Sequence, residues 1–208
     1  MELIVKPVGS LQANCYVLFD EASKEAVVID PGHSGNRILD ILNERGLKLK
    51  YVLLTHGHGD HIGGLPEILE GTGAQVLIHE ADLEMLQDNE LNYTRMIHYP
   101  EVHVTTAGLL EEEQQLEFGS IKIRVLHTPG HTKGGACFLI EDKLFAGDTL
   151  FNGSIGRTDF QGGSFDEIKQ SIQEKLFLLD EDIVVYPGHG SPTTIKKEKH
   201  TNPFVGMK

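Results

Sequence analysis

The sequence is poor in cysteine and contains no long apolar run. Its two cysteines, Cys15 and Cys137, each lie in an apolar strand-like segment, so we expect reduced core residues of a cytoplasmic protein. No segment approaches the ~18 consecutive apolar residues that a membrane-spanning helix needs. Residues 1–7 contain no basic stretch followed by an apolar one, so we also expect no signal peptide.

Positive charge is scarce as well. The chain has 18 Lys and Arg and 31 Asp and Glu, which gives a net charge of −13. Nucleic acids and anionic membranes bind basic patches, so we expect neither as a partner and expect a small-molecule substrate instead. The 208 residues, 39% of them apolar, show no linker and predict a single domain spanning 1–208. The oligomeric state stays open.

Four ligand-type side chains lie within six residues, directly after an apolar run at positions 51–54. They are His56, His58, Asp60 and His61. Glycines separate them, so the backbone can turn tightly and aim several of them at one point. Solvated turns seldom use three histidines, and cores do not bury so many imidazoles without partners. The motif therefore predicts a metal site.

The same pattern recurs three times further along the chain. An apolar strand ends, a glycine allows a turn, and a ligand-type residue follows: His131, Asp148 and His189. If these strands lie side by side, their ends meet at one edge of a sheet and seven candidate ligands converge. His127 precedes Thr-Pro and is better interpreted as a strand residue.

Seven donors exceed the needs of one tetrahedral ion. They suit two divalent ions about 3.5–4 Å apart that share a carboxylate, for which Asp148 is the natural bridge. The mixture of imidazole and carboxylate suits zinc, which we expect first, and also iron or manganese. Water between two such ions becomes a hydroxide nucleophile near neutral pH, which Asp60 and Asp148 can orient or deprotonate. Ser154 and Ser164 lie in no triad-like context, so we expect no covalent mechanism.

The seven residues in this order resemble the metallo-β-lactamase superfamily, most closely its short glyoxalase II-like (hydroxyacylglutathione hydrolase-like) members. The resemblance implies that His56, His58 and His131 bind one metal, that Asp60, His61 and His189 bind the other, and that Asp148 bridges. Asp30, in the segment 28–32, would orient a ligand without binding metal itself. The alternative is that Asp30 only stabilises the turn before Pro-Gly.

The resemblance also implies the fold, an α+β four-layer αβ/βα sandwich of two mixed β-sheets with helices on the outer faces. The hydrophobic pattern agrees, since strand-like and helix-like segments alternate. Expected strands are 3–8, 14–20, 25–30, 51–55, 75–79, 121–127, 136–141, 143–147 and 182–186. Expected helices are 34–45, 65–71, 80–88, 164–178 and 193–200. The helix from Ser164 begins with a capping box, and Phe165, Ile168, Ile172, Leu176 and Leu179 form its core stripe.

The activity implied is metal-dependent hydrolysis of an acyl thioester, such as S-lactoylglutathione. Arg157 stands near the position where glyoxalase II holds glutathione with a lysine, and Asp159 and Phe160 replace an aromatic part. Only 19 residues follow His189, so we expect no helical domain that clamps glutathione. Alternatives are a mononuclear iron persulfide dioxygenase on the same scaffold, or another metallo-hydrolase such as a lactonase or phosphodiesterase. A β-lactamase is disfavoured, because those enzymes are exported and generally lack the bridging aspartate.

Three questions stay open at this level. The stretch 93–101 mixes aromatic and polar residues and forms either a lid over the site or a packed loop. His33 and His79 either face the site or serve the loop and strand in which they lie. The native metal and the exact acyl and thiol parts of the substrate are also not determined by the sequence.

Overall fold

Two six-stranded β-sheets make up the centre of the computed structural model, which describes residues 1–207. The first sheet has the strand order β1-β2-β3-β4-β5-β6, with β1 (Glu2–Val8), β2 (Ala13–Phe19), β3 (Glu25–Ile29), β4 (Lys48–Leu53), β5 (Gln75–His79) and β6 (Gly108–Leu110). Strands β1 to β3 pair antiparallel and β3 to β6 pair parallel, so the sheet is mixed.

The second sheet has the order β14-β13-β10-β9-β8-β7. Its strands are β7 (Gln115–Phe118), β8 (Ile121–His127), β9 (Ala136–Ile140), β10 (Lys143–Gly147), β13 (Val184–Pro187) and β14 (Thr193–Thr194). Only β10 and β13 pair parallel, so this sheet is mixed too. A small hairpin of β11 (Leu150–Phe151) and β12 (Ser154–Ile155) stands beside it.

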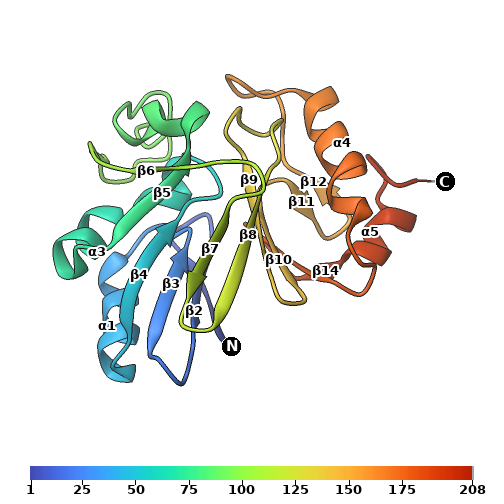
Figure 1. Cartoon of the computed structure of the whole chain (residues 1–208). Helices are drawn as coiled ribbons and strands as arrows, with labels where there is room; N and C mark the ends of the chain where they lie inside the picture. Colours follow the sequence, from blue (N-terminus) through green and yellow to red (C-terminus); the bar gives the residue numbers. More distant parts are fainter. Residues whose placement is uncertain (208) are drawn as a thin grey trace.

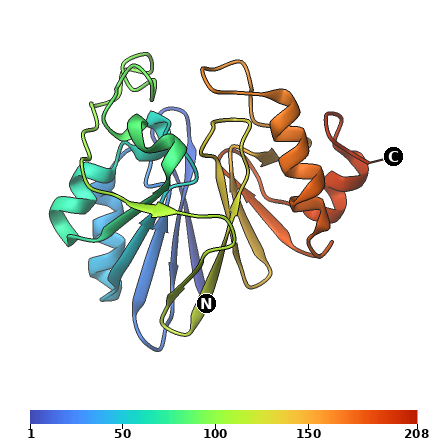
Figure 2. The same cartoon turned by 45° about the horizontal axis from the view of Figure 1, so that its top comes forward.

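Helices cover the outer face of each sheet. The first sheet carries α1 (Gly35–Arg45) and α3 (Leu65–Thr72), and the second carries α4 (Phe165–Glu174) and α5 (Ile195–Thr201) (Figure 1). The turned view shows the two sheets between these helix pairs, with both sheets reaching the same upper end of the molecule (Figure 2). A short helix, α2 (Gly59–Ile62), follows β4.

Alternation along the strands explains the layers, because successive side chains point to opposite faces. In β2, Cys15 and Val17 pack with α1 and α3, whereas Tyr16 and Leu18 pack against the second sheet. All seven residues of β2 are buried, as in a strand covered on both faces. The predicted α+β four-layer sandwich with two mixed sheets is confirmed.

Some local predictions are wrong. The predicted helix over 164–178 begins with Ser164 accepting from the Glu167 amide, but α4 ends at Glu174 and a 3₁₀ turn (Leu176–Leu178) follows. Phe165 was assigned to the core and is 45% exposed, because it occupies the first turn, ahead of the buried Ile168. The predicted helix over 80–88 is a 3₁₀ helix, Glu80–Leu86.

Both cysteines are buried, and neither is in a disulfide. Cys15 lies in β2 and Cys137 in β9, on different layers of the core. Within residues 1–207, no helix combines the length and the apolar character that crossing a bilayer requires.

Candidate metal centre

The loop after β4 carries the first four candidate ligands and is held in a tight, buried path. Gly57 and Gly59 permit it, since a Cβ at Gly57 would lie 2.6 Å from Met85 and one at Gly59 2.5 Å from Thr94 Oγ1. At the start of the loop, the amide and hydroxyl of Thr55 donate to Asp30 at 2.8 and 2.6 Å. The loop is thus anchored to the end of β3 before the histidines begin.

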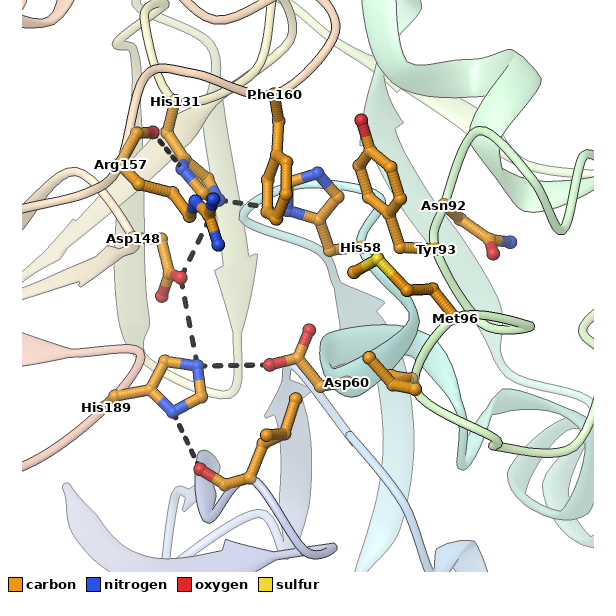
Figure 3. Close-up of a pocket in the computed structure, with 12 residues that line it drawn as sticks. His58, Asp60, Asn92, Tyr93, Met96, His131, Asp148, Arg157, Phe160 and His189 are labelled. Atoms are coloured by element: carbon orange, nitrogen blue, oxygen red, sulfur yellow. Dashed lines mark hydrogen bonds and ion pairs between the residues drawn. The ribbon is translucent and has the colours of Figure 1, made fainter.

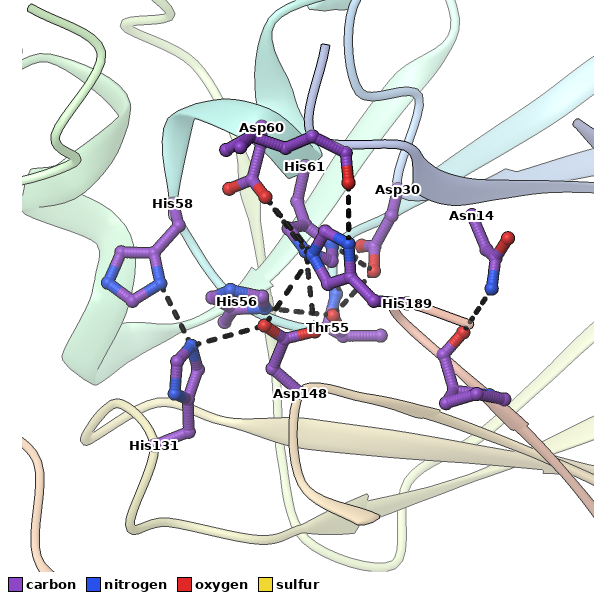
Figure 4. Close-up of polar contacts among 12 residues, drawn as sticks. Asn14, Asp30, Thr55, His56, His58, Asp60, His61, His131, Asp148 and His189 are labelled. Atoms are coloured by element: carbon purple, nitrogen blue, oxygen red, sulfur yellow. Dashed lines mark hydrogen bonds and ion pairs between the residues drawn. The ribbon is translucent and has the colours of Figure 1, made fainter. Parts of the chain in front are cut away.

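Three histidines form a first cluster. His56, His58 and His131 offer nitrogen atoms that all lie within 4.8 Å of one another, and all three are buried. His58 Nδ1 and His131 Nε2 approach to 2.9 Å (Figure 4). The chain therefore brings residues 73 positions apart into one potential coordination sphere.

A second cluster lies beside the first. Asp60, His61 and His189 also offer donors within 4.8 Å of one another. His189 Nε2 lies 3.1 Å from Asp60 Oδ2 and 3.3 Å from His61 Nε2. Asp60 and His61 come from α2 and His189 from the turn after β13, so the cluster joins the two halves of the sandwich.

Asp148 stands between the clusters. Its Oδ1 lies 3.5 Å from His61 Nε2, and its Oδ2 lies 3.6 Å from His131 Nε2 and 3.8 Å from His189 Nε2. Gly147, at the end of β10, precedes it with φ +46°, and a Cβ there would lie 2.3 Å from Thr55 Oγ1. A glycine is needed for this turn, which directs the carboxylate toward both clusters.

Hydrogen bonds fix the tautomers of three of the histidines. Their Nδ1 atoms face oxygen acceptors: Asp30 Oδ2 for His61 at 2.9 Å, the Arg157 carbonyl for His131 at 2.8 Å, and the Leu11 carbonyl for His189 at 3.1 Å. Such oxygens only accept, so Nδ1 holds a hydrogen and Nε2 is the nitrogen left to bind a metal. Those Nε2 atoms face the interior of the site, as metal ligands require.

Unpartnered atoms show that the cluster fits a cation. His56 Nε2 and Asp148 Oδ1 are buried without a hydrogen-bond partner. Buried polar atoms without partners are costly, and a divalent cation supplies what these lone pairs lack.

The charges support the same conclusion. Burial, and then the neighbouring imidazoles, lowers the pKa of His58 to about 3 and that of His56 well below its usual value, so both rings are neutral ligands. Although burial opposes it, the carboxylates of Asp60 and Asp148 raise the pKa of His61 to about 10. Carboxylates that draw a proton onto a buried imidazole would equally attract a divalent cation.

Asp30 lies beneath the second cluster. Its Oδ1 accepts from the Thr55 amide, and its Oδ2 accepts from Thr55 Oγ1 and His61 Nδ1. It is also close enough to His56 and His61 to form a third possible ligand group. Three donors already occupy both of its oxygens, so its contacts suit a residue that orients His61.

An open cavity of about 380 Å³ leads to the clusters (Figure 3). Its floor is formed by ligand-type side chains, and its walls come from three separate segments of the chain. The wall residues are Leu11, Asn92, Tyr93, Met96, Ile97, Arg157 and Phe160. The sequence leaves two possibilities for the stretch 93–101, a lid over the site or a packed loop. In the structure this stretch contributes Tyr93, Met96 and Ile97 to the wall of the cavity.

The seven candidate ligands therefore lie together, but not at the edge of one sheet. The loop of His56 follows β4 in the first sheet, whereas Asp148 and His189 follow β10 and β13 in the second. The prediction of a single edge is wrong because the strands that precede the ligands belong to two sheets. The ligands still meet, since both sheets end at the same side of the sandwich. His79 stacks on His127 at 3.8 Å, and His33 packs on Tyr99 at 4.8 Å, so each serves its own surroundings.

Asp82 was missed by the sequence analysis. It is buried within the 3₁₀ helix Glu80–Leu86 and accepts hydrogen bonds from Gly57, Thr132 and Gly134. Nothing in its local sequence distinguishes it from the exposed acidic residues around it, because its partners are distant in the chain.

Known proteins show the same organisation. The family model described as the metallo-beta-lactamase superfamily matches residues 8–189. Hydroxyacylglutathione hydrolase GloC of Haemophilus influenzae is 35% identical over 212 residues, which cover all of both chains. The crystal structure of the BLEG-1 B3 metallo-beta-lactamase superposes with a TM-score of 0.92 at 36% identity, over 98% of this chain and 99% of that one.

A second solved structure bears on the metal. TTHA1623, crystallised in a di-iron-bound form, superposes with a TM-score of 0.86 at 33% identity, over 98% of this chain and 100% of that one.

Proposed function

The chain belongs to the metallo-beta-lactamase superfamily, and we propose that it is a binuclear hydrolase of acyl thioesters, of glyoxalase II type. The carrying observation is the pair of ligand clusters with Asp148 between them. The similarity to the hydrolase GloC supports the choice of a thioester. In this reaction water adds to the carbonyl carbon, the C–S bond breaks, and a carboxylate and a thiol are released.

Each cluster would hold one ion. His56, His58 and His131 would bind the first, Asp60, His61 and His189 the second, and Asp148 would bind both. We propose zinc, with iron or manganese as alternatives that the same donors accept; the di-iron form of TTHA1623 supports iron. Two bound ions would lower the pKa of a water between them and polarise the carbonyl of the substrate.

The protein's own groups complete the chemistry. Asp60 and Asp148 both line the cavity, so either carboxylate can orient the attacking water and accept its proton. His131 is held in place by the Arg157 carbonyl, and His61 by Asp30. Because these contacts exist before substrate binds, the donors need little rearrangement during the reaction.

The test is hydrolysis of S-D-lactoylglutathione by the metal-loaded protein, followed as loss of the thioester absorbance. We expect turnover, two metal ions per chain, and a fall of about a hundredfold or more in kcat/KM for Asp148→Asn. If the protein hydrolyses no thioester, the proposal is overturned. A single iron per chain with oxygen uptake on glutathione persulfide would instead establish the dioxygenase alternative.

Hydrolysis of β-lactams is the second candidate, because BLEG-1 carries that description and covers nearly the whole chain at 36% identity. Both reactions open a carbonyl group, so the same two clusters would serve. Nitrocefin assayed with the same metal-loaded preparation separates the two. A higher kcat/KM for nitrocefin than for thioesters would reverse the order of the candidates.

A further inference from the structure

The cavity wall beside His58 is aromatic and apolar. The rings of Tyr93 and Phe160 lie 4.4 Å apart, and each lies near the His58 imidazole, at 5.4 and 5.5 Å (Figure 3). Met96 and Ile97 continue the same wall. A group attached to a carbonyl bound at the first cluster would therefore lie against this aromatic pair.

The wall is held together by hydrogen bonds between distant segments. Tyr93 Oη accepts from the Gln161 amide at 3.1 Å, which joins the 93–97 stretch to the Phe160 loop. Tyr99 Oη accepts from the Leu11 amide at 3.2 Å and lies 3.0 Å from Ser10 Oγ. Two tyrosines thus fix the stretch at both sides of the cavity, so the apolar surface is a built part of the site.

The one cationic side chain that lines the cavity within the described residues, Arg157, is already paired. Its Nε and Nη2 donate to the two oxygens of Asp159, both at 2.7 Å, and its guanidinium lies 3.7 Å from the Phe160 ring centre. The hydrogen bonds from Arg157 lower the pKa of Asp159 to about 2, so that carboxylate is ionised at neutral pH. A carboxylate on the substrate that approaches Arg157 would also meet the charge of Asp159.

We propose that this cavity selects thioesters with an apolar group beside the carbonyl and an uncharged thiol arm, in preference to thioesters of glutathione, whose two carboxylates find no unpaired cation among the described residues that line the cavity. Tyr93 and Phe160 are the specificity-determining residues for the acyl group, and the Arg157–Asp159 pair is the one for the thiol. The inference rests on the proposed thioester hydrolysis and names its substrate class.

The test uses four thioesters, phenylacetyl and D-lactoyl groups each attached to N-acetylcysteamine or to glutathione, with the metal-loaded protein. We expect phenylacetyl-N-acetylcysteamine to have the highest kcat/KM. Phe160→Ala should lower it about tenfold for the phenylacetyl esters and much less for the lactoyl esters, as the loss of an apolar contact predicts. Phe165→Ala, which removes an exposed phenylalanine outside the cavity, is the matched control.

The thiol preference is tested by Asp159→Asn, which leaves Arg157 without its anionic partner. We expect kcat/KM for the glutathione esters to rise about threefold relative to the N-acetylcysteamine esters, the scale of an exposed ion pair. The matched control is Asp142→Asn, which removes the carboxylate of another exposed pair, with Lys143, outside the cavity. Binding of the thioethers S-benzyl-N-acetylcysteamine and S-benzylglutathione, measured by calorimetry, should show the same order.

Two outcomes overturn the inference in distinguishable ways. Faster hydrolysis of the glutathione ester than of the N-acetylcysteamine ester with the same acyl group refutes the substrate class and leaves thioester hydrolysis standing. Hydrolysis of none of the four esters refutes the proposed function and the inference together.

Discussion

Asp82 accepts a hydrogen bond from Thr132 Oγ1 at 2.6 Å, across 50 positions of the chain. The same carboxylate accepts from the amides of Gly134 at 2.7 Å and Gly57 at 3.3 Å. It therefore links the loop that carries His56 and His58 to the loop that carries His131. A Cβ at Gly134 would lie 2.7 Å from Asp82, so this glycine is needed for the contact.

We expect Asp82→Asn to weaken metal binding at the first cluster about 10–100-fold, the usual effect of losing a residue that supports metal ligands. The amide retains the shape but replaces one acceptor oxygen with a donor, which would face a backbone amide or the Thr132 hydroxyl. Competition with a fluorescent chelator measures the affinity. Asp40→Asn, on the exposed side of α1, is the control, and equal affinities in the two variants would contradict the linking role.

Asp30→Asn tests the support beneath the second cluster. Its Oδ2 accepts from His61 Nδ1 and Thr55 Oγ1, and its Oδ1 accepts from the Thr55 amide. An asparagine would place its NH2 group against a donor at one of these two positions, so we expect the hold on His61 to weaken and the protein to retain about one metal ion per chain after dialysis. Plasma emission spectrometry gives the count. Retention of the wild-type metal content would show that Asp30 only stabilises its turn.

Much of the site could be predicted because its residues follow apolar strands in a regular way. Spacing alone identifies four candidate ligands, His56, His58, Asp60 and His61. A glycine also directly precedes Asp148 and His189, which indicates a turn at the end of a strand in both places. Each of these signals is local, since a strand, a turn and a ligand are consecutive in the chain. The packing of the two sheets was predicted from the resemblance to the metallo-β-lactamase superfamily.

The remainder depends on contacts between distant segments. Leu11 reaches the cavity because its amide donates to Tyr99 Oη, 88 positions away, and Asp82 acts on residues 25 to 52 positions from it. No periodicity or motif marks such residues. Phe165 shows the opposite error. The helical spacing of apolar residues predicts that it is buried, but it lies one turn before the part of the helix that packs on the core, and it is exposed.

His189→Ala separates the two-metal mechanism from a mononuclear one. His189 belongs to the second cluster, where its Nε2 lies 3.1 Å from Asp60. We expect the variant to lose thioester hydrolysis by about a hundredfold or more, because the second ion loses a ligand. The exposed His103→Ala is the control. Hydrolysis at the wild-type rate in His189→Ala would refute the binuclear mechanism, whereas a mononuclear oxygenase would keep its oxygen uptake.

Three buried groups predict a loss of stability in alkali. Burial raises the pKa of Cys137 to about 11, and it also raises the pKa values of Cys15 and Tyr16. In the unfolded chain a thiol ionises at about pH 8.5 and a tyrosine at about pH 10. Above these pH values the unfolded state releases protons that the folded state keeps, so the free energy of unfolding falls as pH rises, by up to about 1.4 kcal/mol per pH unit for each group.

Urea unfolding at pH 8, 9 and 10 measures this slope. Cys137→Ala should make the decline between pH 9 and 10 shallower by about the contribution of one proton, whatever the mutation does to the stability at pH 8. The comparison between wild type and variant holds the metal content and all other titrating groups constant. An unchanged slope would mean that the Cys137 thiol has the same pKa in the folded and the unfolded protein. Burial of this thiol against α4 would then not raise its pKa.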